Sequence, residues 1–240
     1  STYNFIMIVG SIKENLSIEK SVSITPETAK NIIALGLDIN LQKNYAVHLG
    51  IEDKQYEANG VKFYSSAKEI INNSNLILKV NCPTDEEIKA LKEKTILVGI
   101  FNPSKNQDKL EKILKKNINI FSLEMLPRIT RAQSMDILSS QANLAGYKAV
   151  IESFANFEKA IPMMMTAAGT IPAAKVLVVG AGVAGLQAIA TAKRMGAIVF
   201  ATDVRMASKE QVESLGGKFL TVEGSEKLET EVGYAKDAAE

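Results

Sequence analysis

Residues 175–185 read KVLVVGAGVAG, and they carry the clearest indication of a fold in the chain. A run of aliphatic residues ending at position 179 predicts a buried strand, and glycines follow at positions 180, 182 and 185. The next segment, VAGLQAIATAKRMG (183–196), is predicted to form a helix that stops at its last glycine. A G-x-G-x-x-G pattern between a strand and a helix is typical of the turn that opens a dinucleotide-binding βαβ unit.

Each glycine of that turn has its own predicted role. Gly180 permits the tight turn, Gly182 lets a diphosphate approach the backbone, and Gly185 lets the helix pack close to the strand. The amino-terminal end of the helix offers unpaired N–H groups and a positive dipole end to the diphosphate. A tight turn that binds nothing is the alternative interpretation of the same residues.

Asp203 ends the next predicted strand, AIVFATD (197–203), 18 residues beyond Gly185. Its carboxylate can accept hydrogen bonds from the ribose hydroxyls of adenosine, and it would repel a 2′-phosphate. This position therefore favours NAD(H) over NADP(H). Arg205 argues the other way, because a nearby arginine can accommodate that phosphate.

The rest of the chain also predicts an α/β fold. Strand-like and helix-like segments alternate with short connections before residue 124, which predicts a mostly parallel sheet covered by helices. The helix over TPETAKNIIALG (25–36) has signals at both ends, with Thr25 as N-cap and Gly36 as stop. Strands are expected at residues 3–9 (ending at Gly10), 37–43, 61–66, 76–81, 95–101 and 118–124.

These segments predict two Rossmann-like lobes with mostly parallel sheets, joined by a long helix. We expect an N-terminal α/β lobe over residues 1–138, a linking helix and connection over 139–165, and the first half of an NAD(H)-binding lobe over 166–240. A full dinucleotide fold needs two βαβαβ halves, and only one follows residue 174. The second lobe therefore reads as truncated.

Composition excludes several classes of function. The formal net charge of +1 gives no electrostatic reason to bind nucleic acid. A single cysteine, Cys82, rules out a disulfide within the chain, and no group of cysteines and histidines has zinc-ligand spacing. The only histidine, His48, reads as a packed or surface side chain. No run of eighteen apolar residues predicts a membrane span.

The stretch LPRITRAQSMD (126–136) holds two of the four arginines of the chain and follows the sixth predicted strand, at the junction of the lobes. By itself it favours an N-cap and first turn of the long helix. Ligand sites of open α/β sheets lie at the carboxyl ends of strands, however, and hydride transfer between two nicotinamide rings needs positioning groups rather than a general acid. Four side chains here could fix such a ring: Arg128, Gln133, Asp136 and Ser139. The pattern assigns no role to Arg131.

Three segments carry a resemblance to a known family: PRITRAQSMDILSSQANLAGYKAV, MMMTAAGTIPAAKVLVVGAGVAGLQAIATAKRMGA and ATDVRMASKEQVESLGGKF. They resemble the alpha-subunit NAD(H)-binding domain, domain I, of proton-translocating NAD(P) transhydrogenases, almost continuously over residues 124–222. The resemblance implies an NAD(P)+ transhydrogenase, of the Si-specific or proton-translocating type, of which this chain forms only a portion. It implies NAD(H) bound here and NADP(H) bound on a partner domain.

The resemblance also implies partners, a location and a set of contacts. A homodimer would dock on the NADP(H)-binding domain and a membrane domain, at the matrix or cytoplasmic face of an energy-coupling membrane. A mobile loop over residues 223–237 would close over NAD(H). The contacts carried over are Arg128, Gln133, Asp136 and Ser139 for the nicotinamide end, Gly180, Gly182, Val183, Ala184 and Gly185 for the diphosphate, Asp203, Val204 and Arg205 for the adenosine end, and Gly233 and Tyr234 from the loop.

Two other functions compete with this one. Alanine dehydrogenases share the two-lobed architecture and bind pyruvate with an arginine, a lysine and a histidine. The corresponding positions here look like Lys20, Lys79 and Asn102, so the acid that would protonate the carbonyl is missing. The third interpretation is a non-catalytic NAD(H)-binding module.

Overall fold

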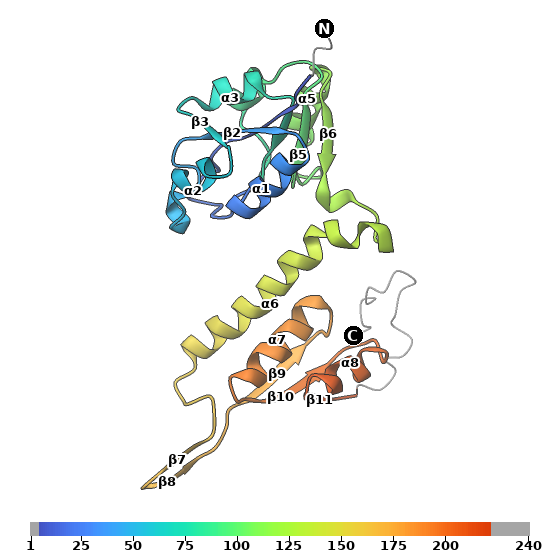
Figure 1. Cartoon of the computed structure of the whole chain (residues 1–240). Coiled ribbons are helices and arrows are strands. Elements are labelled where there is room, and N and C mark those ends of the chain that lie inside the picture. The colour runs from blue at the N-terminus through green and yellow to red at the C-terminus, as the bar shows by residue number, and fades with distance from the viewer. Residues whose placement is uncertain (1–4, 222–240) are drawn as a thin grey trace. The chain divides into compact units, whose positions relative to one another are not determined.

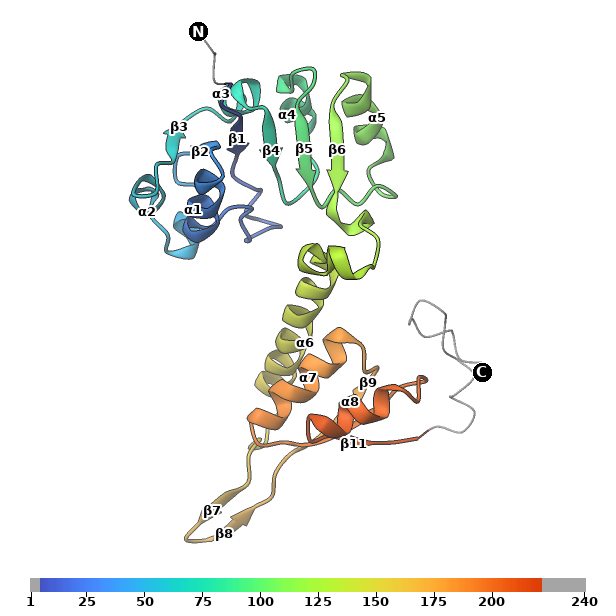
Figure 2. The same ribbon diagram turned by 45° about the vertical axis from the view of Figure 1, so that its right-hand side comes forward.

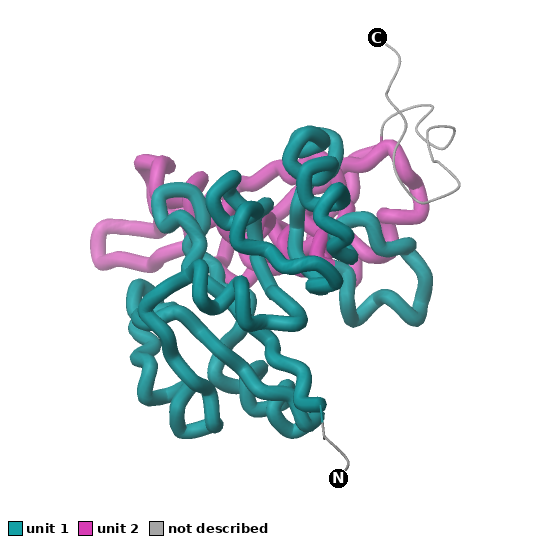
Figure 3. The backbone as a smooth tube through the Cα atoms, turned by 90° about the horizontal axis from the view of Figure 1, so that it is seen from above, with its two compact units in different colours: residues 1–136 teal, residues 137–240 magenta. Residues whose placement is uncertain are grey.

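The computed structural model describes residues 5–221, and the chain divides into two compact units, residues 1–136 and residues 137–240 (Figure 3). The long helix falls in the second unit. The finer division predicted from the sequence, with a separate linking segment over residues 139–165, stays a prediction. Both units alternate strands and helices, so the predicted α/β class is confirmed (Figures 1 and 2).

The first unit is built on a six-stranded parallel sheet with the order β3-β2-β1-β4-β5-β6. This is the strand order of a doubly wound dinucleotide fold, whose chain reverses direction across the sheet between β1 and β4. The strands are β1 (Ile8–Ser11), β2 (Asp38–Gln42), β3 (Lys62–Tyr64), β4 (Leu76–Leu78), β5 (Ile96–Gly99) and β6 (Asn119–Ser122). The helices are α1 (Pro26–Ala34), η1 (Val47–Leu49), α2 (Asp53–Glu57), α3 (Ala67–Asn73), α4 (Asp85–Ala90), α5 (Gln107–Lys115), η2 (Leu123–Met125) and η3 (Thr130–Met135).

Two clusters of buried apolar side chains cover this sheet. One joins α3, α4 and α5 to the sheet around Ile70, Leu97 and Ile113, and the other joins α1 and α2 to it around Leu41 and Tyr56. All five of these side chains are buried. Because helices bury both faces of the sheet, side chains on both sides of each strand must be apolar. This explains why the strands are short, nearly continuous apolar runs in the sequence.

The predicted caps are present. The Thr25 hydroxyl accepts a hydrogen bond from the Thr28 N–H at 3.2 Å, and Gly36 has a φ of +87° just after α1. Thr84 and Glu87 form a reciprocal capping box at the start of α4. Local signals therefore placed these helix ends well.

The first strand was predicted wrongly. It occupies Ile8–Ser11 rather than residues 3–9, and Gly10 lies inside it rather than ending it. A Cβ atom on Gly10 would lie 2.0 Å from Ser74 Oγ and 3.0 Å from Ile70 Cγ2. Gly10 is thus a point of close contact between β1 and the end of α3, which no local pattern reveals.

The second unit holds a three-stranded parallel sheet with the order β11-β10-β9. Strand β9 lies at its edge, whereas the first strand of a full dinucleotide fold lies in the middle. The elements are α6 (Ile137–Asn156), β7 (Met164–Thr166), β8 (Gly169–Ile171), β9 (Lys175–Val179), α7 (Val183–Arg194), β10 (Ile198–Thr202), α8 (Ser208–Ser214) and β11 (Lys218–Phe219).

Helix α6 lies along α7, as the two views agree (Figures 1 and 2). The two backbones meet at Gly146, where a Cβ atom would lie 2.1 Å from the carbonyl oxygen of Ala184. Val150 of α6 joins Ile189 of α7 and Val199 of β10 in the buried cluster of this unit. Helix α6 therefore belongs to the packing of the βαβ unit.

A hairpin of β7 and β8 was not predicted from the sequence. Its strands pair antiparallel, and every residue in them is exposed. Met163, Met165 and Ile171 expose 58%, 82% and 40% of their surface.

Among the described residues, no helix has both the length and the apolar character needed to cross a bilayer.

Candidate nucleotide-binding site

The glycine turn of the second unit has the geometry that its sequence predicts. Gly180 follows β9 with a φ of +96°, a conformation that side chains disfavour, and its N–H donates to the Thr202 carbonyl at 2.8 Å. Gly182 is the N-cap of α7. The chain thus turns sharply from the end of β9 into the helix.

Gly185 and Gly182 differ in what surrounds them. A Cβ atom on Gly185 would lie 1.7 Å from the Gly180 carbonyl oxygen, so only glycine fits where α7 crosses the turn. A Cβ atom on Gly182 would meet nothing closer than Arg205 Nη2 at 3.6 Å. No backbone atom therefore crowds Gly182, and its one near neighbour is the end of a flexible side chain, so these residues fit the approach of a diphosphate.

The first turn of α7 supplies donors at the same place. Val183 and Ala184 open this 12-residue helix, and the N–H groups of a first helical turn have no intrahelical acceptor. The positive end of the helix dipole adds to their attraction for an anion. Contact with α6 at Gly146 fixes the position of this turn.

Asp203 follows β10 and is buried, with 7% of its surface exposed. Its Oδ2 accepts the N–H of Ala181 at 2.7 Å, which ties the acid to the glycine turn, and its Oδ1 accepts the N–H of Arg205 at 2.7 Å. Burial alone would raise the pKa of Asp203. Hydrogen bonds from the Arg205 side chain and from the backbone of Ala181 and Arg205 outweigh burial and lower that pKa to about 2.

Arg205 makes a forked ion pair with the same carboxylate. Its Nε lies 3.0 Å from Oδ1 and its Nη2 lies 3.0 Å from Oδ2 of Asp203. Sequence reasoning anticipated that both side chains lie near the adenosine end, but it did not anticipate this pairing. Val204, between them, is partly buried. The second unit thus brings together the predicted diphosphate and adenosine residues.

The predicted nicotinamide residues fall in both units. Residues 130–135 form the separate helix η3, so the view of this stretch as the N-cap and first turn of the long helix is wrong. Arg128 Nη2 lies 3.9 Å from Asp136 Oδ2, and Gln133 is exposed on η3. Ser139 belongs to the first turn of α6 in the second unit. Gly233, Tyr234 and the predicted loop lie outside the described residues.

A buried charge cluster in the first unit was not predicted. Lys79 is 6% exposed, and its Nζ lies 3.1 Å from Glu14 Oε1 and 3.8 Å from Glu87 Oε1. Glu14 also accepts the backbone N–H groups of Val80 and Asn81. The cluster lies just after β1 and β4, where the strand order reverses. Lys79 and Glu14 are 65 residues apart in the sequence, so no local pattern predicts that they pair. The only signal in the sequence is an acidic residue, Glu14, shortly after the first strand.

His48 and the possible metal ligands add no chemistry to this site. His48 Nε2 lies 2.7 Å from the Lys20 carbonyl, so this nitrogen donates and the ring holds the chain that follows β1. Within residues 5–221, no group of three or more histidine, cysteine, aspartate or glutamate side chains could hold a metal ion. Around the glycine turn, the described residues thus supply backbone donors, Asp203 and Arg205.

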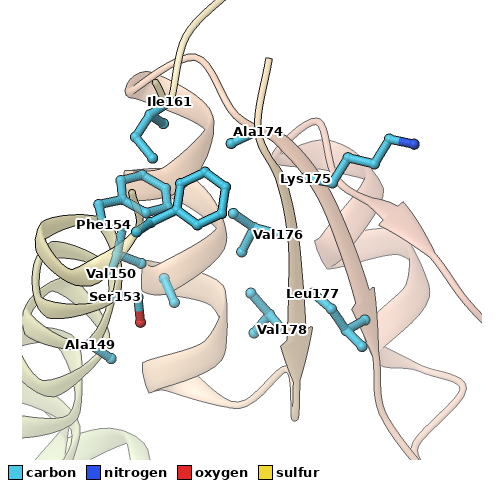
Figure 4. Close-up of a pocket in the computed structure, with 12 residues that line it drawn as sticks. Ala149, Val150, Ser153, Phe154, Ile161, Ala174, Lys175, Val176, Leu177 and Val178 are labelled. Atoms are coloured by element: carbon cyan, nitrogen blue, oxygen red, sulfur yellow. The ribbon is translucent and has the colours of Figure 1, made fainter. Parts of the chain in front are cut away.

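An apolar groove of about 360 Å³ lies between α6 and β9 in the second unit (Figure 4). Val150 and Phe154 of α6 face Val176 and Val178 of β9, whereas Lys175 points away from the groove. Most of this lining is apolar, and it lies beside β9, the outer strand of the sheet within the described residues.

Two family descriptions match the chain, and their boundary falls close to that between the two compact units. The family description "Alanine dehydrogenase/PNT, N-terminal domain" matches residues 10–145, and "Alanine dehydrogenase/PNT, C-terminal domain" matches residues 149–237. The chain belongs to the alanine dehydrogenase/PNT family. Within it, the chain is 48% identical over 237 residues to an NAD(P) transhydrogenase alpha subunit of Rickettsia prowazekii (strain Madrid E). That alignment covers 97% of this chain and 62% of its relative.

The chain is more similar to a transhydrogenase than to an alanine dehydrogenase of the same family. The crystal structure of transhydrogenase from Sinorhizobium meliloti superimposes with a TM-score of 0.85 at 46% identity, over 89% of this chain and 64% of that one. An alanine dehydrogenase of Methanococcus maripaludis is only 26% identical over 218 residues, covering 90% of this chain and 58% of its own. The sequence is thus similar to the transhydrogenase branch, and it spans less than two thirds of the length of these relatives.

Proposed function

We propose that this chain is the NAD(H)-binding component of a proton-translocating transhydrogenase. The observation that carries the proposal is the glycine turn, where no backbone atom crowds Gly182, helix N–H groups lie beside it and Asp203 is tied to it at 2.7 Å. The 48% identity to a transhydrogenase alpha subunit supports the same function.

The proposed reaction moves one hydride from C4 of the dihydronicotinamide ring of NADH to C4 of the ring of NADP+ on a partner domain. NADH becomes NAD+ and NADP+ becomes NADPH, and the carbons that react release no proton. This chain then needs to hold one ring and exclude water from it. Arg128, Gln133, Asp136 and Ser139 are the proposed positioning groups, since they offer donors and acceptors for a carboxamide.

The proposed partners follow from the proposed reaction. The NADP(H)-binding domain must face the nicotinamide end, and a membrane domain couples hydride transfer to proton movement. We place the chain at the matrix or cytoplasmic face of an energy-coupling membrane. A homodimer is supported by the hairpin of β7 and β8, because a two-stranded hairpin with exposed methionines is marginally stable alone.

Alanine dehydrogenase activity is disfavoured by the state of Lys79. An ammonium group that binds a substrate carboxylate must be accessible and free of other carboxylates. Lys79 is buried and pairs with Glu14 at 3.1 Å. A substrate would have to break this buried ion pair, which typically costs several kcal/mol.

The decisive experiment mixes the full-length protein with the NADP(H)-binding domain of a homologous transhydrogenase. NADPH is supplied on the partner and an oxidised NAD+ analogue with a shifted absorbance on this protein, so hydride transfer is read as a colour change. We expect rapid transfer on mixing. Alanine-dependent reduction of NAD+ by this protein alone is measured in parallel.

Three results separate the competing functions. Transfer that needs both proteins supports the transhydrogenase proposal. Tight binding of both nucleotides without transfer would instead identify a non-catalytic NAD(H)-binding module. Alanine-dependent NAD+ reduction would identify an alanine dehydrogenase and overturn the proposal.

A further inference from the structure

Residues 125–135, MLPRITRAQSM, follow β6 directly and have the composition of a protein interface (Figure 1). Lysine, aspartate and glutamate are absent from this stretch, although the chain carries 28 basic and 27 acidic side chains. Methionine and arginine are enriched where proteins meet, whereas those three charged residues are depleted there. Met125, Ile129 and Met135 expose 68%, 53% and 51% of their surface. The stretch therefore presents apolar side chains to the solvent beside its two arginines.

Arg131 is the arginine of this stretch that has no role in the fold. Its side chain is exposed, and within the described part of the chain it makes no ion pair. Arg128 differs, because its Nη2 lies 3.9 Å from Asp136 Oδ2. A guanidinium without a carboxylate beside it is available to the carboxylate of another protein, which it can bind through two parallel hydrogen bonds.

Helix η3 places Arg131 next to Gln133. It is a 3₁₀ helix with about three residues per turn, so successive side chains point about 120° apart around its axis. Ala132, between the two, is 7% exposed and marks the inner side of the helix. Arg131 and Gln133 are exposed on the two other sides. A protein that covers Arg131 therefore lies beside the group proposed to hold the nicotinamide ring.

Hydride transfer indicates which protein this is. The two reacting carbons must approach to about 3–3.5 Å, so the domain that brings NADP+ has to reach the ring held at Gln133. We propose that residues 125–135 form the docking surface for the NADP(H)-binding domain, with Arg131 binding a carboxylate of that domain. The exposed apolar side chains of the stretch pack against it. The inference rests on the proposed hydride transfer to a partner domain.

The test measures docking of the full-length protein to the NADP+-loaded binding domain of a homologous transhydrogenase by isothermal titration calorimetry. Arg131→Glu reverses the charge, and we expect the Kd for the domain to rise at least about tenfold, because two anions then face each other. Arg131→Met keeps an unbranched side chain and should raise the Kd less. Arg194→Glu, at an exposed arginine in the last turn of α7, is the matched control and should leave this Kd within about twofold.

Three further measurements separate docking from other causes. Circular dichroism and the Kd for NADH should be the same in Arg131→Glu as in the wild type. Hydride transfer by this variant should recover when the partner domain is saturating, which a misplaced ring would not allow. The calorimetry is repeated with the nucleotide-free domain, where we expect the same relative loss. A loss confined to the loaded domain would make the nucleotide phosphates the anion and overturn the carboxylate contact.

Two results would reject the docking surface. A folded Arg131→Glu protein that docks as tightly as the wild type is the first. Weaker self-association in sedimentation, with docking unchanged, is the second, because the surface would then join two copies of this chain. A wild type that neither docks nor transfers hydride is a different result, since it removes the proposed function itself. Wild-type transfer with an unaffected Arg131→Glu protein rejects the docking surface alone.

Discussion

At the scale of single residues, two glycines of one turn have different roles. Gly185 is required by the fold, because the backbone of Gly180 occupies the place of its missing side chain. A Cβ atom on Gly182 would make only an ordinary contact, with Arg205 Nη2 at 3.6 Å. The motif is often read as one signal, but here Gly185 meets a packing requirement, whereas Gly182 is the glycine that we propose for binding.

Matched alanine substitutions test this separation. Gly185→Ala places Cβ 1.7 Å from a backbone oxygen, so we expect a loss of several kcal/mol in the free energy of unfolding. Gly182→Ala should keep the stability within about 1 kcal/mol and weaken NADH binding at least about tenfold. Urea denaturation and NADH titration measure the two effects. Equal destabilisation by both substitutions would contradict the separation.

Asp203 gives the protein a specific acid sensitivity. Its folded pKa of about 2 lies below the ordinary value of 3.8, so its charged form stabilises the fold. That stabilisation, about 2 kcal/mol, is fully present above about pH 4 and is lost as the pH falls towards 2. Asp203→Asn should therefore lower the stability at pH 7 and narrow its difference from the wild type below pH 4. Urea denaturation at pH 7, 5, 4 and 3 measures this, with the exposed Asp38→Asn as the control.

At the scale of elements, the contact of α6 with α7 positions the glycine turn. The turn and α7 are local in sequence, but the helix that holds them begins more than forty residues earlier, at Ile137. Gly146 is the point of closest approach, against the carbonyl of Ala184 in the first turn of α7. Strain at this crossing therefore reaches the diphosphate site directly.

Gly146→Ala shows whether the close packing of α6 on α7 or the helix propensity of the residue dominates stability at this position. Helix propensity alone predicts that alanine stabilises an exposed helix by about 1 kcal/mol. Because the added Cβ would lie 2.1 Å from Ala184 O, we expect the opposite sign, with a loss of about 2 kcal/mol or more. Thermal denaturation compares it with Ala145→Gly, which changes an exposed neighbour. Stabilisation by Gly146→Ala would mean that the helices can separate without cost.

The hairpin of β7 and β8 carries the proposal of a homodimer. Met165 is 82% exposed, so Met165→Lys should leave the folding of one chain unchanged. If the hairpin contacts a second copy, we expect the dimer dissociation constant to rise at least about tenfold, because a charge would be buried there. Sedimentation analysis measures it. Met125→Lys, at an exposed position of the first unit, is the control and should have no effect.

At the scale of the whole molecule, the two units hold different groups of site residues. The second unit holds the residues proposed for the diphosphate and the adenosine, and the first holds Arg128 and Gln133, which are proposed for the nicotinamide. The six-stranded sheet of the first unit has the order of a nucleotide fold, yet a buried ion pair of Lys79 and Glu14 fills the reversal point after β1 and β4.

Gln133→Ala tests this division between the units. We expect hydride transfer to fall roughly a hundredfold, because displacement of a reacting ring by about 1 Å has that effect. NADH binding should weaken only a few fold, since the diphosphate residues are untouched. Stopped-flow hydride transfer and NADH titration separate the two effects, with Ser134→Ala as the exposed control. Equal losses in rate and affinity would mean that Gln133 stabilises the bound nucleotide equally in the ground state and the transition state, and so does not position the ring for reaction.

Sequence alone was enough for the α/β class, the helix cap at Thr25, and the glycine turn with the acid that follows β10. All of these depend on neighbours within a few residues, or on the regular spacing of one βαβ unit. The sequence also predicted that Asp203 and Arg205 lie near one another, because only one residue separates them.

The folded chain was needed to find the place of Gly10 inside β1, the hairpin of β7 and β8, the buried pair of Lys79 with Glu14, and the forked pairing of Arg205 with Asp203. Except for the hairpin, each arises from backbones or side chains that meet across many residues of sequence, or from a rotamer that only the folded surroundings select. The hairpin is local, with Thr166 opposite Gly169, but its residues carry no strong turn signal. Helix η3 belongs here as well. A stretch that reads as the first turn of α6 forms its own short helix in the first unit.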